Sequence, residues 1–238
     1  PVAMAGGPYS GPENTAIALS GAASSDSDGF IASYAWDCTT DGSVDSISSS
    51  PTTTCTYADQ GAFTATLVVT DSNGATASAT ASVAVFNVAP FFTSVVAPSV
   101  GDEGAILAFS AGVSDVAAGD ILDLAVTWSW GDGTADTEGT SATHTYIDDG
   151  AWTVTVTVVD LDGGVASQTV SLVTLNVDPT ITTTPGPTAQ QGVSYSYLPT
   201  VTDPGDEVFD WVLTGAVSSN LVFDAATGAI SWVPDSAD

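Results

Sequence analysis

The sequence contains no lysine and no arginine, and its only histidine is His144. It has 28 acidic residues, so its formal net charge at pH 7 is −28. Proteins bind the phosphates of nucleic acids and of anionic lipids mainly through Lys and Arg side chains. The composition therefore excludes nucleic-acid binding, and it disfavours anionic membrane surfaces and phosphoryl-transfer chemistry.

Other features that define common function classes are also missing. There is no run of 18 apolar residues, so we expect no membrane insertion. The sequence has no nucleophile-elbow serine motif and no pair of histidines for a hydrolytic triad or a zinc site. Counting alone does not rule out a pair of catalytic carboxylates, but a small β domain without a large cleft is a poor host for one. We therefore expect that the chain is not an enzyme.

The pattern that is present has a period of two residues. Thr alternates with Val, Leu, Ala or an aromatic residue over residues 62–70 and 151–159, while helical periodicity is nearly absent. Asp-Gly and Asn-Gly turn clusters separate the alternating runs at short intervals. This combination predicts an all-β chain of antiparallel β-sandwiches.

The alternating pattern repeats along the chain. Asn87, Asp71 and Tyr57 return about 89 residues later as Asn176, Asp160 and Tyr146. We therefore expect three tandem domains joined by short Pro-containing linkers in an elongated rod. Their predicted bounds are residues 1–89, 90–178 and 179–238.

The first two domains resemble the Ig-like sandwiches of the polycystic-kidney-disease (PKD) family. The resemblance is carried by residues 25–37, 56–64 and 68–74 of the first domain, and by residues 126–133, 144–146 and 158–163 of the second. It covers residues 1–178, and several motifs occur in the same order and spacing.

The third segment is similar instead to the cadherin-like Ig domains of bacterial surface proteins, through residues 195–197, 202–206 and 221–232. Such domains continue with a turn and two more strands, so this third sandwich is expected to lack its last strands. Either the segment is cut from a longer polypeptide, or a neighbouring copy donates the missing strands in a head-to-tail filament.

The PKD resemblance also implies roles for the two cysteines and the histidine. Cys38 and Cys55 align with Trp130 and His144 of the second domain, where PKD-like domains place an aromatic residue and a histidine facing each other. We therefore expect a Cys38–Cys55 disulfide and an oxidising compartment, with His144 packed on Trp130 in the core. A metal-bound cysteine pair is the alternative, but it lacks further ligands.

The acidic residues are unevenly divided, with 24 Asp against 4 Glu. Asp is common in turns and in calcium loops, because its short carboxylate reaches either the backbone or an ion. Asx-turns without an ion, and adaptation to salt, are the alternative explanations. The candidate calcium ligands lie in turns and at matched repeat positions: Glu13, Asp26, Asp28, Asp71, Asn87, Glu103, Asp115, Asp120, Asp160, Asp162, Asn176, Asp203 and Asp206.

We expect an extracellular or cell-surface structural or adhesive protein, of the kind found in prokaryotes. Its domains would form a stiff, calcium-braced spacer or a filament subunit, with copies of itself or adjoining domains of a longer surface protein as partners. The alternative is an accessory module that binds polysaccharide or collagen for a secreted hydrolase. Exposed aromatic side chains in a row would favour the alternative, and aromatic side chains confined to the cores would favour the spacer.

Overall fold

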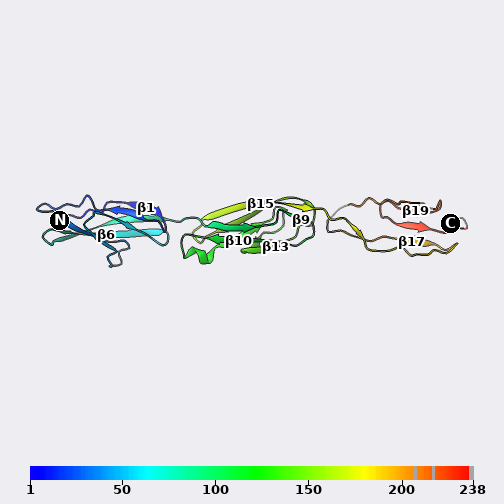
Figure 1. Cartoon of the computed structure of the whole chain (residues 1–238), viewed down its shortest axis with the longest axis horizontal. Coiled ribbons are helices and arrows are strands. Elements are labelled where there is room, and N and C mark those ends of the chain that lie inside the picture. Colours follow the sequence, from blue (N-terminus) through cyan, green and yellow to red (C-terminus); the bar gives the residue numbers. More distant parts are fainter. Residues whose placement is uncertain (206–207, 216–217, 236–238) are drawn as a thin grey trace.

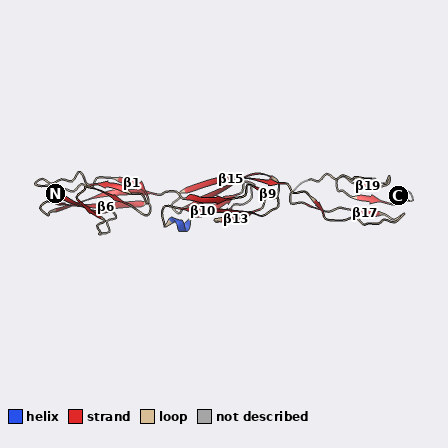
Figure 2. Cartoon of the chain, viewed as in Figure 1, coloured by secondary structure: helices blue, strands red, loops and turns tan. Residues whose placement is uncertain are grey.

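The computed structural model describes residues 1–205, 208–215 and 218–235, which form three successive β units arranged end to end (Figure 1). Strands dominate the regular structure (Figure 2), and the described residues contain one helix, the short 3-10 helix η1 (Asp120–Asp123). None of the described residues form a helix long and apolar enough to cross a membrane. The predicted all-β class and the tandem arrangement of sandwiches are confirmed.

The first sandwich packs a five-stranded sheet against a two-stranded sheet. Its strands are β1 (Tyr9–Pro12), β2 (Ile17–Ser20), β3 (Ile31–Asp37), β4 (Ser46–Ser48), β5 (Thr52–Cys55), β6 (Gly61–Asp71) and β7 (Thr76–Phe86). The large sheet has the order β1-β7-β6-β3-β4, and β2 pairs with β5. All these neighbours are antiparallel except β1 and β7, which run parallel.

The second sandwich repeats this plan with a three-stranded and a five-stranded sheet. Its strands are β8 (Phe91–Val96), β9 (Val100–Asp102), β10 (Leu107–Ser114), β11 (Ala125–Ser129), β12 (Thr137–Glu138), β13 (Ser141–His144), β14 (Gly150–Val159) and β15 (Val165–Leu175). The sheet orders are β13-β10-β8 and β12-β11-β14-β15-β9. Here too the early strand β9 runs parallel to the last strand, β15.

Each of these two sandwiches has its own apolar core, built by the period-two pattern. In β6, Ala65, Leu67 and Val69 are fully buried, while the residues between them, Thr66 and Val68, are only partly buried. In β14, Val154, Val156 and Val158 are fully buried, and the threonines between them are partly buried. Burying one such side chain contributes about 1.5–3 kcal/mol. A one-residue slip in register would turn the whole buried row to solvent, so the pattern fixes the strand pairing.

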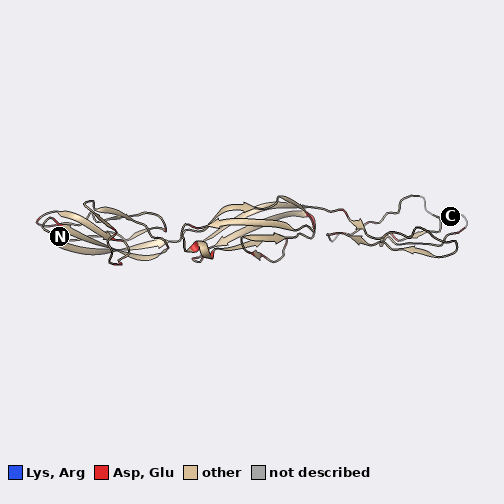
Figure 3. Cartoon of the chain, turned by 60° about the horizontal axis from the view of Figure 1, so that its bottom comes forward, with Lys and Arg blue, Asp and Glu red and all other residues tan. Residues whose placement is uncertain are grey.

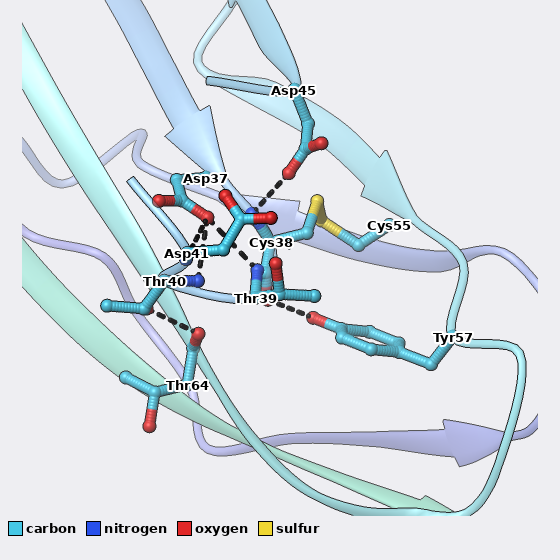
Figure 4. The surroundings of a disulfide bond; sticks show 9 residues. All are labelled: Asp37, Cys38, Thr39, Thr40, Asp41, Asp45, Cys55, Tyr57 and Thr64. Carbon is cyan, nitrogen blue, oxygen red and sulfur yellow. Dashed lines mark hydrogen bonds between the residues drawn. A yellow bond between two sulfur atoms is a disulfide. The ribbon is translucent and has the colours of Figure 1, made fainter. Parts of the chain in front are cut away.

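The Cys38–Cys55 disulfide is present at one end of this first core (Figure 4). It lies beside a tight loop in which the Asp37 carboxylate accepts hydrogen bonds from the backbone N–H groups of Thr39, Thr40, Asp41 and Gly42. Burial alone would raise the pKa of Asp37, but these four donors outweigh it and hold the pKa below its ordinary value. The Tyr57 hydroxyl donates to the Cys38 carbonyl at 3.0 Å, so the loop is fixed from both sides.

The second sandwich has a stack of aromatic rings where the first has its disulfide. The His144 ring lies parallel to Trp130 with ring centroids 4.4 Å apart, and it meets the edge of Tyr146 at 4.6 Å. His144 Nε2 is 2.7 Å from Asp132 Oδ2, so its carboxylate partner is Asp132. The Tyr146 hydroxyl donates to the Trp130 carbonyl at 2.9 Å, which matches the Tyr57–Cys38 bond. His144 is therefore part of the packing, as the resemblance implies.

The third unit is smaller than the other two. Its described residues form a two-stranded sheet and a three-stranded sheet, of orders β16-β18 and β17-β20-β19. The strands are β16 (Thr180–Ile181), β17 (Tyr195–Tyr197), β18 (Val201–Thr202), β19 (Val222–Phe223) and β20 (Ile230–Trp232). Among its described residues only Pro199, Gly228 and Pro234 are buried. The described part of the third unit therefore shows no counterpart of the two apolar cores.

Replacing both cysteines, as Cys38→Ser with Cys55→Ser, tests the disulfide's contribution to stability. The bond closes a loop with a sequence separation of 17, so we expect the free energy of unfolding of the first domain to fall by about 3 kcal/mol. Urea titration followed by the fluorescence of Trp36, the single tryptophan among residues 1–89, measures this change. Reductant should reproduce the loss in the parent chain and leave the double variant unchanged; stability unaffected by both treatments would contradict the assignment.

Candidate metal centre between the first two domains

A short linker joins the first two sandwiches, and each sandwich makes a hydrogen bond to it. Strand β7 ends at Phe86 and β8 begins at Phe91. In the linker between them, the Val88 backbone N–H donates to Glu13 Oε1 of the first sandwich at 2.8 Å. The Asn87 side-chain amide donates to Asp160 Oδ2 of the second sandwich at 2.9 Å. These two bonds fix the direction in which the chain leaves one domain and enters the next.

Three carboxylates from the two sides of this joint come together. Glu13 belongs to the first sandwich, and Asp115 and Asp120 belong to the second; each offers an oxygen within 4.8 Å of the others. Their exposed fractions are only 1%, 5% and 4%. Glu13 Oε2, Asp115 Oδ2 and Asp120 Oδ2 have no hydrogen-bond partner. A buried carboxylate oxygen without a donor is costly, and each of these three neighbouring side chains has one.

The local structure explains why one oxygen of each carboxylate is left over. Glu13 directly follows β1, and its Oε1 is used by the linker N–H. Asp115 directly follows β10, and its Oδ1 accepts the Ala117 backbone N–H at 3.0 Å. Asp120 is the first residue of η1, which lies at the end of the second sandwich that faces the first (Figure 2). Backbone bonds thus orient Glu13 and Asp115 and leave the second oxygen of each without a donor.

The charged side chains at the joint are all acidic. Burial raises the pKa of Asp120 to about 6, and the neighbouring carboxylates of Asp162, Asp59, Asp115 and Glu13 add to this rise. No Lys or Arg exists in the sequence to offset the repulsion. The carboxyl at the centre of the joint therefore lacks a positive partner within the described structure.

Asp160 lies beside the linker and behaves differently. Burial would raise its pKa, but the Asn87 amide and the backbone N–H groups of Gly164, Asp162 and Gly163 lower it below the ordinary value. Asp160 thus serves as a hydrogen-bond acceptor that clamps the linker.

Two further groups of carboxylates have the spacing of a metal site. Asp59, Asp120 and Asp162 form one at the same joint, with Asp59 and Asp162 exposed; Glu103, Asp148 and Asp149 form the other at the far end of the second sandwich. In Figure 3 the ribbon is coloured as acidic at both ends of the second sandwich, including η1, and the sequence contains no Lys or Arg to be coloured as basic. Acidic groups therefore lie at both joints of the rod.

The second joint repeats part of the first. The Val177 backbone N–H donates to Glu103 Oε1 at 2.8 Å, as Val88 does to Glu13. Asp203 accepts the backbone N–H of Gly205 on Oδ1 and has no hydrogen-bond partner on Oδ2, which matches Asp115. Asn176 lies in the second linker and is exposed. Asp206, the remaining predicted ligand there, lies outside the described residues.

The predicted residues at the N-terminal end of the first sandwich form a smaller arrangement. Asp26 Oδ1 is 3.3 Å and Asp71 Oδ2 is 3.9 Å from the Pro1 nitrogen. Asp26 Oδ2 has no hydrogen-bond partner, like its counterparts Asp115 and Asp203. Asp28 is exposed and belongs to none of the three carboxylate groups found among the described residues.

Sequence reasoning missed Asp59, Asp148 and Asp149. The signal that would have found the first two is the repeat itself, since Asp59 and Asp148 each come two residues after the matched Tyr57 and Tyr146.

The donor set at the first joint suits a hard divalent cation. Calcium binds six to eight oxygens at about 2.3–2.6 Å, so ligand oxygens on opposite sides of one ion lie about 4.6–5.2 Å apart. The carboxylates of Glu13, Asp115 and Asp120 meet that spacing. In the linker, the side-chain oxygen of Asn87 is also buried without a hydrogen-bond partner. The carboxylate group at the first joint could therefore hold a metal ion.

Comparison with known families identifies the first two units. A sequence model of the PKD domain matches residues 1–85 and 87–175, well over half of the chain. The chain therefore belongs to the PKD domain family, with two tandem PKD domains followed by a further β region. Only these non-catalytic domains are identified, and no catalytic domain is found. PKD domains combined with a disulfide are typical of a secreted or cell-surface protein.

Solved structures with a similar fold include the PKD1 domain of the Vibrio cholerae metalloprotease PrtV, at 20% identity and a TM-score of 0.30, covering 37% of this chain and 98% of that one. The fibronectin(III)-like modules of CbhA from Clostridium thermocellum are 16% identical at a TM-score of 0.31, covering 72% and 93%. The protocadherin GammaB4 extracellular domain is 14% identical at 0.31, covering 95% and 42%. A comparison with curated protein sequences gives no match. The family assignment rests on the sequence match to the PKD domain.

The raised pKa of Asp120 predicts how stability depends on pH when calcium is absent. The ordinary value is 3.8 and the folded value is about 6, so folding favours the protonated form. The stabilising contribution is therefore full below about pH 4 and is lost as the pH rises through about 6. With a chelator present, the thermal midpoint should fall between about pH 4 and pH 6. Asp120→Asn should reduce that fall; an unchanged slope in the variant would show that Asp120 is not responsible.

Gly164→Ala tests the close contact between the linker and the second domain. A Cβ at Gly164 would lie 2.3 Å from Asp160 Oδ2 and 2.8 Å from the Ala89 Cα. We expect the free energy of unfolding to fall by about 1–3 kcal/mol, because the linker must move. Gly119→Ala is the matched control, since a Cβ there meets nothing within 4 Å. Equal midpoints for both variants in thermal denaturation would argue against a tight linker.

Proposed function

We propose that this chain is a stiff, calcium-braced spacer of an extracellular structural or adhesive protein. The observation that carries the proposal is the convergence of Glu13 with Asp115 and Asp120 across the first joint. An ion held there would bind both domains at once and would resist bending between them. It would also supply the positive charge that the sequence lacks.

Direct contacts between the domains support the spacer role. The Asn14 side-chain amide of the first sandwich donates to the Val116 carbonyl of the second. At the second joint Gly104, the counterpart of Asn14, approaches Pro204 so closely that a Cβ at Gly104 would lie 2.5 Å from the Pro204 Cβ. The units are therefore packed end against end in addition to being tied by linkers (Figure 1).

The distribution of aromatic side chains favours a spacer over a carbohydrate-binding module. Trp36, Trp128 and Trp130 are fully buried in the two cores. Among the described residues, no Trp or Tyr is exposed, and the exposed aromatic residues are Phe30, Phe86 and Phe91. Sugar-binding platforms need exposed aromatic faces with polar groups around them. Polysaccharide or collagen binding is thus the weaker alternative.

The third unit supports a head-to-tail version of the same role. Its Tyr195, Leu221 and Trp232 line an apolar hollow of about 380 Å³. Strands added from a neighbouring copy would bury this surface and pair the short sheet edges. Electron microscopy of the purified chain distinguishes filaments, which support copies of itself as partners, from single short rods, which support adjoining domains of one polypeptide.

Calcium titration tests the proposed bracing. Ca²⁺ at 100 times its dissociation constant should stabilise the protein by about 2.7 kcal/mol, and small-angle scattering should show a narrower range of bend at the first joint. Glu13→Gln with Asp115→Asn should abolish most of both effects, because each amide keeps an oxygen for its backbone donor but loses the charge. The exposed pair Glu138→Gln with Asp136→Asn is the matched control. A parent chain that calcium neither stabilises nor stiffens would refute the proposal.

A further inference from the structure

Asp120 belongs to two carboxylate groups at the same joint. It lies with Glu13 and Asp115 in the buried group, and with Asp59 and Asp162 in a second group that opens to solvent. In each group the ligand oxygens lie within 4.8 Å of one another. Both groups take residues from the two sandwiches, since Glu13 and Asp59 belong to the first and the others to the second.

The side chain of Asp120 is suited to bridging. The residue is 4% exposed, and its Oδ2 has no hydrogen-bond partner. A carboxylate offers two oxygens with about four acceptor positions, so it can bind one ion on each side. Being buried, unpartnered and shared between the two groups, Asp120 is the residue that joins them.

The charge of the joint calls for more than one divalent ion. The two groups together contain five carboxylates, Glu13, Asp59, Asp115, Asp120 and Asp162. One divalent ion would leave a formal charge of about −3 and two would leave about −1, and the sequence has no Lys or Arg to make up the difference. Residual like charges at this spacing disfavour the packed joint.

The position of Asp120 depends on extra residues in the second domain. In the first domain, Asp26 and Trp36 are ten positions apart, whereas their counterparts Asp115 and Trp128 are thirteen apart. The longer segment contains η1, which begins with Asp120. The insertion therefore brings a carboxylate to the joint that the equivalent loop of the first domain does not supply.

We propose that the first joint binds two divalent cations, an inner one at Glu13, Asp115 and Asp120 and an outer one at Asp59, Asp120 and Asp162. This inference rests on the proposed calcium-braced function and adds the number and order of the ions. The inner ion binds more tightly because its ligands are withdrawn from water and already oriented. The outer ion keeps more water ligands and exchanges more readily, so full bracing requires the higher calcium concentration.

Isothermal titration of the full chain with CaCl₂ tests the proposal through differences in stoichiometry. Asp59→Asn with Asp162→Asn should remove one bound Ca²⁺ relative to the parent chain and leave the tighter site in place. Glu13→Gln with Asp115→Asn should remove the tighter site, and the four substitutions together should remove two ions. Asp123→Asn with Asp136→Asn is the charge-matched control, because both residues are exposed and lie outside the carboxylate groups. Differences between variants cancel any ion bound at the second joint.

The outcomes separate this inference from the function on which it rests. One ion lost in each double variant, and two in the combined variant, would support the two-ion joint. Loss of only one ion in the combined variant, or no loss of an ion when Asp59 and Asp162 are replaced, would overturn the two-ion joint. Either result would still be compatible with a single calcium ion that braces the joint. No difference between the parent chain and the variant lacking Glu13 and Asp115 would overturn both. Circular dichroism at matched temperature confirms that each variant is folded.

Discussion

A chain without Lys or Arg must find another partner for every carboxylate that it buries, and this constraint organises the two PKD domains. Asp37 and Asp160 find theirs in backbone N–H groups, which lower the pKa of both carboxyls. Glu13 and Asp115 are only half satisfied in this way, with one oxygen on the backbone and the other in the joint. Turn-forming Asp residues and joint-forming acidic residues are thus two uses of the same side-chain chemistry.

Because the domains repeat, the same hydrogen bonds recur at both joints of the rod. Glu13 and Glu103 each hold the linker that follows their own domain, through the backbone N–H groups of Val88 and Val177. Asp115 and Asp203 each present a second oxygen at the entrance of the following unit. The second unit therefore carries one half of a joint at either end, with Asp115 at its entrance and Glu103 at its exit. The mode of stacking is thus encoded in the domain and not in the linker alone.

Much of this arrangement could be predicted from the sequence, because its causes are local or periodic. The period-two runs around Leu67 and Val156 predict the strands and their buried faces, and the aligned positions of Cys38 and His144 predict how the two cores differ. The meeting of Glu13 with Asp120 could not be predicted, because it depends on how two folded bodies are oriented. The role of Asp59 was hidden for the same reason, since its partners lie in another domain.

The parallel pairing of β1 with β7, and of β9 with β15, governs how the rod responds to tension. A pull along the rod enters a domain near its early strand and leaves through its last strand. Because these two strands run side by side in the same direction, the load slides one along the other, and the hydrogen bonds between them share it simultaneously. In an antiparallel pair at that place, the hydrogen bonds between the strands would break one after another. Tension along the chain would therefore load the β1–β7 and β9–β15 pairs in shear.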